Sequence, residues 1–509
     1  MIFNMKVEDV LKKLSREQLK TLSKQDLIEL LIGEQDIREQ LENLRQQAEE
    51  EKILIGERYV LVKRKMFGAS SEKMPPPKNS SKSTSKKNRD NFSKNLRERY
   101  PNIEEREEVI SLETPPICSC CQSPMVDSGM TEDSEYLTVE PKKYILVIQK
   151  RQKYRCGKCH GEIQTAPALP RIAPGSSYSD EVILDVSLSK YCDLLPVERY
   201  AKIAERLGVK NLPSNSLIGL THHLSDFVLE AYRKLAAEVK TSRVIKADET
   251  PHRMLEGDEK SNWYLWGFSS EKASYFEFHD TRSGEVASEF LKNSDCKFLL
   301  SDVFSGYARA VSDANKYRTE NNLELMVNVY CNAHARRKFD EAKHPFQNEA
   351  TFYLEKYQEI YKLEKETSNK SPEEIIKIRS QMIPLFQSMK EKCAGDLNSC
   401  SNRSSLAKAI NYFLNNFDEF TKFIITPEIP IDNNSQERAL RNPVIGRKTW
   451  YGTHSKRGAE TAAILFSIME SCKLSKVNPR EYLKNLVQDL HAGKNAYTPK
   501  EYADLAKNN

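Results

Sequence analysis

The sequence predicts a multidomain α/β protein built around a mixed β-sheet that is covered by helices. Its 509 residues exceed the size of one ordinary domain. Between residues 242 and 279, three strand-like runs are separated by polar turns, which indicates an antiparallel meander. Helical and strand-like segments then alternate as far as residue 333. This order of elements is typical of a mixed sheet.

The composition is typical of a soluble protein. Hydrophobic residues make up 39% of the chain and charged residues 30%. No apolar stretch approaches the roughly 18–20 residues that span a bilayer, and the N-terminus shows no cleavable apolar segment. The eleven cysteines are mostly isolated, which argues against a disulfide framework. We therefore expect a cytoplasmic protein with no membrane partner.

Residues 1–66 are expected to be helical, because apolar residues recur there at helical spacing. The run of Ile37, Leu41, Leu44 and Ala48 has approximate heptad spacing among charged residues. It predicts a short coiled coil over about residues 34–66. The heptad pattern decays after Ala48, so helix packing within one chain is the alternative.

Residues 67–100 are predicted to form a basic, disordered linker. The stretch from 68 to 95 is rich in Ser, Lys and Pro and almost free of apolar side chains, so it cannot bury a core. Twelve Lys/Arg and only three Asp/Glu lie between Lys63 and Arg99, on a chain whose net charge is +5. Such a block favours a polyanionic partner, most simply nucleic acid. A solvated basic linker is the alternative.

Two Cys-x-x-Cys pairs predict a zinc-ribbon-like module over residues 111–165. Cys118 and Cys121 form one pair, and Cys156 and Cys159 form the other. This spacing lets the thiolates of both pairs approach one tetrahedral, structural Zn²⁺. Because Cys120 is so close, the choice between Cys118 and Cys120 stays open, and two reduced pairs without metal are the alternative. The intervening apolar run at residues 144–148 is predicted to be a strand.

Two further stretches are predicted to be helical. Residues 179–240 contain short helices joined by a turn with Gly208, which resembles a helix-turn-helix, although generic helical packing gives the same pattern. The last of these helices is expected to run unbroken from a Ser cap near residue 214. Residues 346–423 are polar and helical, and they have the character of an insertion.

Three acidic residues in separate stretches form a candidate metal site. Asp248 lies on the first predicted strand, and Asp302 lies at the C-terminal end of the fourth, where open sheets bind ligands. Glu437 is placed in the first turn of a helix that Pro443 is expected to end. The order of strands and helices is also that of the ribonuclease H-like fold. Three converging carboxylates can hold two Mg²⁺ or Mn²⁺ ions that cleave and join phosphodiesters. Taken singly, each acid has an ordinary structural explanation as a capping or surface residue.

The stretch after Glu437 is strongly basic. Residues 438–457 contain six Lys/Arg and no acidic residue, and Trp450, Tyr451 and His454 are interleaved among them. Positive charge and aromatic rings beside a metal-binding site suit the binding of DNA phosphates and an unpaired DNA end. The DNA-binding candidates here are Arg438, Arg441, Arg447, Lys448 and Trp450. A solvated basic face with a buried Trp is the alternative.

Over nearly its whole length the chain resembles bacterial transposases of the insertion sequence 66 family, the TnpC type. The stretches that carry the resemblance include MFGASSEKM, ADETPHRM, SDVFSGY, CNAHARRKFDEA and IDNNSQERALRNPVIGRKTWYGTHSKRGAE. The resemblance implies that Asp248, Asp302 and Glu437 are a catalytic D-D-E triad. It also places Arg336 and Arg337, from the fourth of these stretches, among the DNA-binding residues.

The resemblance further implies the domain order. A homeodomain-like DNA-binding region over about residues 59–110 precedes the zinc-binding module, a catalytic domain spans 175–459, and a helical segment covers 466–505. One departure concerns the residue after the second Asp: the family commonly has Gly there, and this chain has Val303. The acid itself is kept.

The expected function is that of a DNA transposase, which binds terminal inverted repeats, cleaves at the 3′ ends and joins them to target DNA. The resemblance implies a homo-oligomer on DNA and accessory proteins encoded by the same element. A catalytically silent, sequence-specific DNA-binding protein derived from a transposase is the alternative. A third candidate is a structure-specific nuclease, which would cleave without strand transfer.

Overall fold

The computed structural model describes residues 23–67, 96–100, 104–108, 114, 116–125, 134–140, 142–155, 163–255 and 262–508. The chain forms two compact units. One comprises residues 1–70 and 149–509, and the other comprises residues 71–148. The predicted linker at 68–95 lies outside the described residues, as do Cys156 and Cys159.

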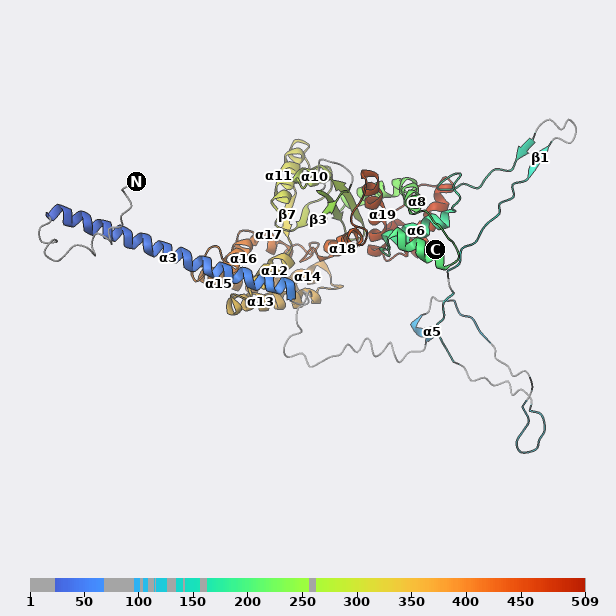
Figure 1. Ribbon diagram of the computed structural model, residues 1–509, viewed down its shortest axis with the longest axis horizontal. Helices are drawn as coiled ribbons and strands as arrows, with labels where there is room; N and C mark the ends of the chain where they lie inside the picture. The colour runs from blue at the N-terminus through green and yellow to red at the C-terminus, as the bar shows by residue number, and fades with distance from the viewer. Residues whose placement is uncertain are drawn as a thin grey trace. The chain divides into compact units, whose positions relative to one another are not determined.

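A five-stranded mixed sheet forms the centre of the larger unit (Figure 1). Its strands are β3 (Val244–Arg253), β4 (Asn262–Ser269), β5 (Ser274–His279), β6 (Phe298–Ser301) and β7 (Val327–Tyr330), in the order β5-β4-β3-β6-β7. β3, β4 and β5 are antiparallel, whereas β6 and β7 run parallel to β3. The mixed sheet predicted from the strand-like runs is therefore confirmed, with β3 at its middle.

The connections after β5 and β6 are helical, as parallel strands require. α10 (Gly284–Leu291) leads into β6, and α11 (Ser305–Glu320) leads into β7. The two helices pack so closely that a Cβ on Gly284 would collide with the carbonyl oxygen of Gly306. Large buried side chains between these helices and the sheet, namely Trp266, Phe268, Phe290 and Tyr307, form part of the main hydrophobic core.

Helices that precede the sheet in the sequence and helices that follow it both contribute to that core. They are α6 (Asp180–Tyr191), α7 (Val197–Arg206), α8 (Ser214–Phe227), α9 (Leu229–Lys240), α19 (Lys456–Leu474), α20 (Pro479–His491) and α21 (Pro499–Asn508). The single helix expected from residue 214 is in fact two, α8 and α9, which meet at the buried Val228. The hydroxyls of Ser467 and Ser471 on α19 accept hydrogen bonds from the backbone N–H groups of Phe276 and Ser274 on β5, at 2.8 and 2.9 Å.

A second hydrophobic core lies among the helices between β7 and Glu437. These are α12 (Asn332–Ala342), α13 (Gln347–Glu366), α14 (Pro372–Ser380), α15 (Ile383–Asn398), α16 (Ser405–Leu414), α17 (Phe417–Thr421) and the 3₁₀ turn η1 (Lys422–Ile424). The buried Asn332 side chain donates to the carbonyl of Phe420 at 2.9 Å, and its backbone N–H donates to that of Ile431 at 3.2 Å. These bonds bring the chain back to the sheet just before Glu437.

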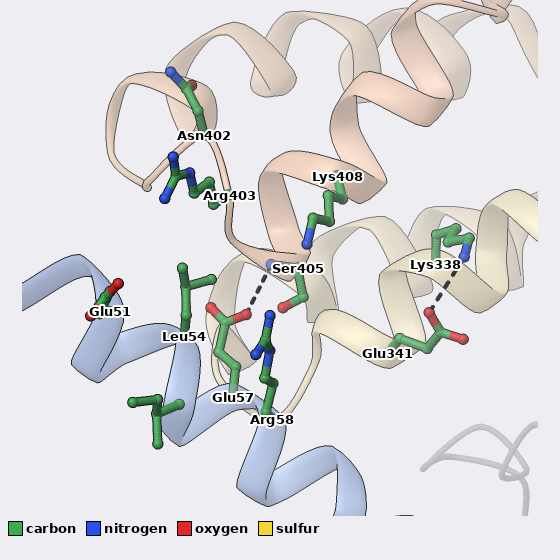
Figure 2. Close-up of a pocket in the computed structure, with 11 residues that line it drawn as sticks. Glu51, Leu54, Glu57, Arg58, Lys338, Glu341, Asn402, Arg403, Ser405 and Lys408 are labelled. Carbon is green, nitrogen blue, oxygen red and sulfur yellow. Dashed lines mark hydrogen bonds and ion pairs between the residues drawn. The ribbon is translucent and has the colours of Figure 1, made fainter. Parts of the chain in front are cut away.

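The long helix α3 (Lys24–Phe67) contacts this second group of helices. Glu57 is buried, and its carboxylate accepts the backbone N–H of Ser405 at 3.0 Å. Ser405 is the first residue of α16, so Glu57 satisfies an N–H that has no partner within its own helix. Figure 2 shows this contact beside a pocket that is also lined by Arg58, Arg403 and Lys408. Coiled-coil pairing of α3 stays a prediction.

The zinc-ribbon-like module stays a prediction as well. Cys118 and Cys121 lie in a tight turn, in which the N–H of Gln122 donates to the carbonyl of Cys118 at 3.0 Å. Backbone N–H groups of Cys121 and Cys120 lower the pKa of the Cys118 thiol, which suits a metal-binding thiolate.

The strand expected at residues 144–148 does not form. The run is exposed, and only Lys153–Arg155 (β1) and Ile163–Thr165 (β2) pair in this part of the described chain. An apolar run without a partner strand gains no ladder hydrogen bonds, so its composition alone does not make it a strand. Among the described helices, none has an apolar stretch of the length that a membrane crossing needs.

We predict that Glu57→Ala loosens α3 from α16. Loss of a carboxylate that caps a helix costs about 0.5–2 kcal/mol, so cleavage within residues 24–67 should become faster in limited proteolysis. Glu51→Ala is the matched control, because Glu51 is exposed on the same helix. Equal cleavage rates for the two variants would contradict the docking role of Glu57.

Candidate active site

Asp248 occupies the middle of the central strand. On β3, Ile245 and Ala247 are buried on one face, and Asp248 belongs to the opposite face because strand residues alternate. Its partner on β4 is Gly267. The Asp248 carboxylate accepts the backbone N–H of Glu249 at 2.9 Å, which holds the side chain close to the strand.

Asp302 lies level with Asp248 on the neighbouring strand. The parallel register pairs Lys246 with Leu300, so Asp248 and Asp302, two residues further along each chain, follow at the same level. They are close enough for the negative charge of Asp302 to raise the pKa of Asp248. Asp302 follows directly after β6. Its Oδ1 is buried and accepts no hydrogen bond among the described residues.

Glu437 approaches from α18 (Asn434–Thr449), whose N-terminus is fastened to β3. The Asn433 side chain donates to the carbonyl of Ala247 at 2.9 Å, and Lys246 donates to the Ser435 hydroxyl at 2.8 Å. Both contacts fall within two residues of Asp248. Glu437 is in the first turn, as expected, but Asn433 bonds the strand instead of capping its own helix with its side chain.

Pro443 does not end this helix, which is a correction to the sequence-based expectation. α18 continues through Pro443 to Thr449. Proline removes the hydrogen bond to the carbonyl four residues earlier, but here Ala439, Leu440 and Pro443 are all buried. We attribute the continuation of the helix to this packing, because tertiary contacts outweigh local preference.

The carboxylates are close enough to disturb one another's ionisation. Burial raises the pKa of Asp248 well above its usual value, and the negative charges of Glu249, Asp302 and Glu437 raise it further. Burial also raises the pKa of Asp302, to about 6, with a further contribution from Glu249. A cluster of acids that resists ionisation is suited to a cation, whose charge would reverse both effects.

Glu249 is a fourth carboxylate of the cluster that the sequence reasoning missed. Its side chain is only 3% exposed and pairs with Arg282 at 2.6 Å. The Tyr307 hydroxyl donates to it at 2.5 Å. Arg282 in turn lies over the ring of Phe304, 4.2 Å from its centre. Glu249 therefore has a cationic partner of its own, whereas Asp248 and Asp302 lack a direct cationic partner among the described residues.

Glu437 faces α12. Its carboxylate lies 3.7 Å from His334 Nε2 and 3.5 Å from the Arg337 guanidinium. Arg337, predicted to bind DNA, thus contacts a predicted catalytic acid, and its neighbour Arg336 is half-buried. Cys331, His334 and Glu437 place one potential ligand atom each within 4.8 Å of one another.

The predicted basic stretch divides into exposed and packed residues. Arg438, Arg441 and Lys448 are exposed, and Arg447 donates to the Thr250 hydroxyl at 3.2 Å, two residues along β3 from Asp248. Trp450 is partly buried and packs against the core. Its ring contacts Tyr191 edge-on, and the Lys190 ammonium lies 4.0 Å from it.

The exposed aromatic residue of this stretch is Tyr451, 81% of which is accessible. Its loop is fixed to the end of β3, since the N–H of Leu255 donates to the Thr453 carbonyl at 2.8 Å, and His252 bonds the Thr453 hydroxyl at 2.6 Å. A Cβ on Gly452, at φ +106°, would collide with the carbonyl of Arg253. The close approach requires glycine there.

Comparison with known proteins identifies a class of DNA-acting proteins, the transposases. A family model described as Transposase IS66 family matches residues 175–461, a range that includes the mixed sheet and the acidic cluster. The chain belongs to this family.

Three relatives come from Sinorhizobium fredii (strain NBRC 101917 / NGR234). Uncharacterized protein y4hP is 23% identical over 415 residues, which cover 77% of this chain and 73% of the relative. Uncharacterized protein y4jD is 26% identical over 391 residues, with 74% and 75% covered. Uncharacterized protein y4qI is 26% identical over 411 residues, with 77% and 73% covered.

The raised pKa of Asp302 predicts how stability depends on pH. In the unfolded chain this carboxyl ionises near its ordinary value, so the metal-free protein should lose up to about 3 kcal/mol as pH rises from about 4 through 6. Asp302→Asn should remove this loss and raise the melting temperature at pH 7.5 in a chelator. Mg²⁺ should stabilise the wild type more at about pH 7.5 than at pH 5. A melting temperature that rises with pH over this range in chelator would contradict the assignment.

Gly267 should be required for α18 to pack against the sheet. A Cβ there would collide with the buried side-chain amide of Gln436 on α18 and with the Phe276 ring. We expect Gly267→Ala to cost about 1–3 kcal/mol and to weaken stabilisation by Mg²⁺. Gly395→Ala, on α15 with nothing within 4 Å, should be neutral or stabilising. If both variants melt like the wild type, α18 does not need the close approach.

Proposed function

We propose that this protein is a DNA transposase of a bacterial insertion sequence, with Asp248, Asp302 and Glu437 as its catalytic D-D-E triad. The observation that carries the proposal is the meeting of these three carboxylates at the middle of the sheet. They come from β3, from the end of β6 and from the first turn of α18. The strand order supports it too, because three antiparallel strands followed by two parallel ones on the other side of β3 is the arrangement of a ribonuclease H-like sheet.

The three residues fit a pair of divalent cations. Asp302 Oδ1 is buried and accepts no hydrogen bond from the part of the chain that the structure describes, and each Asp has its pKa raised by burial and by neighbouring acids. Oxygen ligands of this kind are those that Mg²⁺ or Mn²⁺ prefers. Two such ions, when bound, would activate the attacking oxygen and stabilise the leaving oxygen of a phosphodiester.

The chain's own residues would position the DNA. Arg447 is held by Thr250, two residues along the strand from Asp248, and it can bind a DNA phosphate there. Arg438, Arg441 and Lys448 are exposed on the same helix or its end and can bind phosphates further along the strand. Tyr451 offers an exposed ring for stacking on a base, in the place that the sequence suggested for Trp450.

The remaining parts of the proposal concern assembly. We propose one structural Zn²⁺ on Cys118, Cys121, Cys156 and Cys159, with Cys120 as the alternative to Cys118. The N-terminal region would bind the terminal inverted repeats, and the protein would act in the cytoplasm as a homo-oligomer on DNA with accessory proteins of the same element.

The test is cleavage and joining of an inverted-repeat duplex in Mg²⁺. Asp248→Asn should reduce 3′-end cleavage by at least about a thousandfold, because loss of a metal ligand removes several kcal/mol of transition-state stabilisation. DNA binding should be retained. Asp313→Asn, a surface acid on α11 paired with Lys316, is the control. Equal cleavage by wild type and Asp248→Asn would refute the site. Binding without cleavage by the wild type would favour a silent DNA-binding protein, and cleavage without joining would favour a nuclease.

A further inference from the structure

A thiol, an imidazole and a carboxylate lie close together in the structure; they belong to Cys331, His334 and Glu437. Their ligand atoms all lie within 4.8 Å of one another. Cys331 is the N-cap of α12, and His334 lies three residues later in its first turn, so the two side chains emerge on the same side of the helix. Glu437 comes from the first turn of α18. Two helix N-termini therefore meet at this cluster.

The sheet register places this cluster beside the acidic residues. Ser301 pairs with Tyr330 across β6 and β7, so the next residues, Asp302 and Cys331, lie level with each other. Asp248, Asp302 and Cys331 thus form a row across three neighbouring strands. Glu437 is the residue common to the acidic cluster and to the Cys–His pair.

The donor set distinguishes between cations. Sulfur and nitrogen ligands with one carboxylate are typical of Zn²⁺, whereas Mg²⁺ takes oxygen ligands. In a tetrahedral Zn²⁺ site the ligand atoms lie about 3.3–3.8 Å apart, given Zn–S and Zn–N distances of about 2.3 and 2.0 Å. His334 Nε2 and Glu437 Oε1 are already 3.7 Å apart. The widest separation in the cluster, at most 4.8 Å, needs to shrink by no more than about 1.5 Å. Three protein ligands leave the fourth position open.

Burial raises the pKa of the Cys331 thiol, and two features of its surroundings act against this effect. The backbone N–H of Asn433 donates to Cys331 Sγ at 3.2 Å, and Asn433 is itself fixed to Ala247 on β3. The N-cap position adds the positive end of the α12 dipole. Hydrogen bonds of this kind orient metal ligands and strengthen binding.

We propose that Cys331, His334 and Glu437 bind Zn²⁺, and that the bound ion withdraws Glu437 from Asp248 and Asp302. Zinc would then inhibit the reaction at a site distinct from the Cys-x-x-Cys pairs. The binding site stands on the cluster's geometry alone, whereas the inhibition rests on the proposed transposase function. Arg337, which lies 3.5 Å from Glu437 and is one-third exposed, would give way to the cation.

The first experiment measures binding on the full-length protein. Loaded with Zn²⁺ or Co²⁺ and dialysed, the wild type should hold one more equivalent of metal than Cys331→Ser. Its Co²⁺ form should show a thiolate charge-transfer band that weakens in this variant. Because Cys331 is buried, His334→Gln provides a second variant that leaves the thiol in place, and thermal melts check that both are folded. Cys118→Ser is the control for the other zinc site. Equal metal content and spectra for wild type, Cys331→Ser and His334→Gln would overturn the proposal.

The second experiment separates the two proposals. In the Mg²⁺-dependent cleavage assay, half-inhibition of Cys331→Ser should need at least about tenfold more Zn²⁺ than half-inhibition of the wild type. If the wild type binds the extra zinc but cleaves no DNA in Mg²⁺, the transposase proposal fails and the zinc site stands. If the wild type cleaves and binds the extra zinc without inhibition, the sharing of Glu437 is refuted.

Discussion

The attachment of α18 to β3 is the interaction on which the candidate site depends. Asn433 uses its side-chain amide on the Ala247 carbonyl, and Ser435 accepts from Lys246. These strand residues directly precede Asp248, so a carboxylate 189 positions away along the chain is fixed relative to it. The helices between β7 and α18 have a hydrophobic core of their own. The position of α18 is therefore set by its contacts with the sheet.

Much of the sheet could be predicted from the sequence, because strands and helices leave different apolar periods, and with it the position of each of the three acids on its strand or helix. The alignment of Asp302 with Asp248 could not be predicted. That Asp302 stands level with Asp248 follows from the register of β3 and β6, which depends on packing across the whole sheet. Glu249 could not be recognised from the sequence, because its burial depends on Arg282 and Tyr307, which are distant in the chain.

The errors share one physical cause, which is that tertiary contacts override local preference. Pro443 would end an isolated helix, but burial of one face of α18 carries the helix past it. Trp450, which lies among positive charges, is partly buried and packs on Tyr191 and against Gly446; its contact with DNA stays a prediction. Tyr451, its neighbour, is the exposed one. These two adjacent residues differ in burial, and composition does not predict which of them is exposed.

The serines of α19 have a consequence for assembly. The backbone N–H groups of Ser274 and Phe276 on the outer strand β5 are taken by Ser471 and Ser467, and the Phe276 carbonyl is taken by the Tyr232 hydroxyl. An extended segment of another molecule could not add to the sheet there, because the groups it would pair with are already occupied. A chain that pairs strand to strand with this protein must therefore do so elsewhere than at Ser274 and Phe276 of β5.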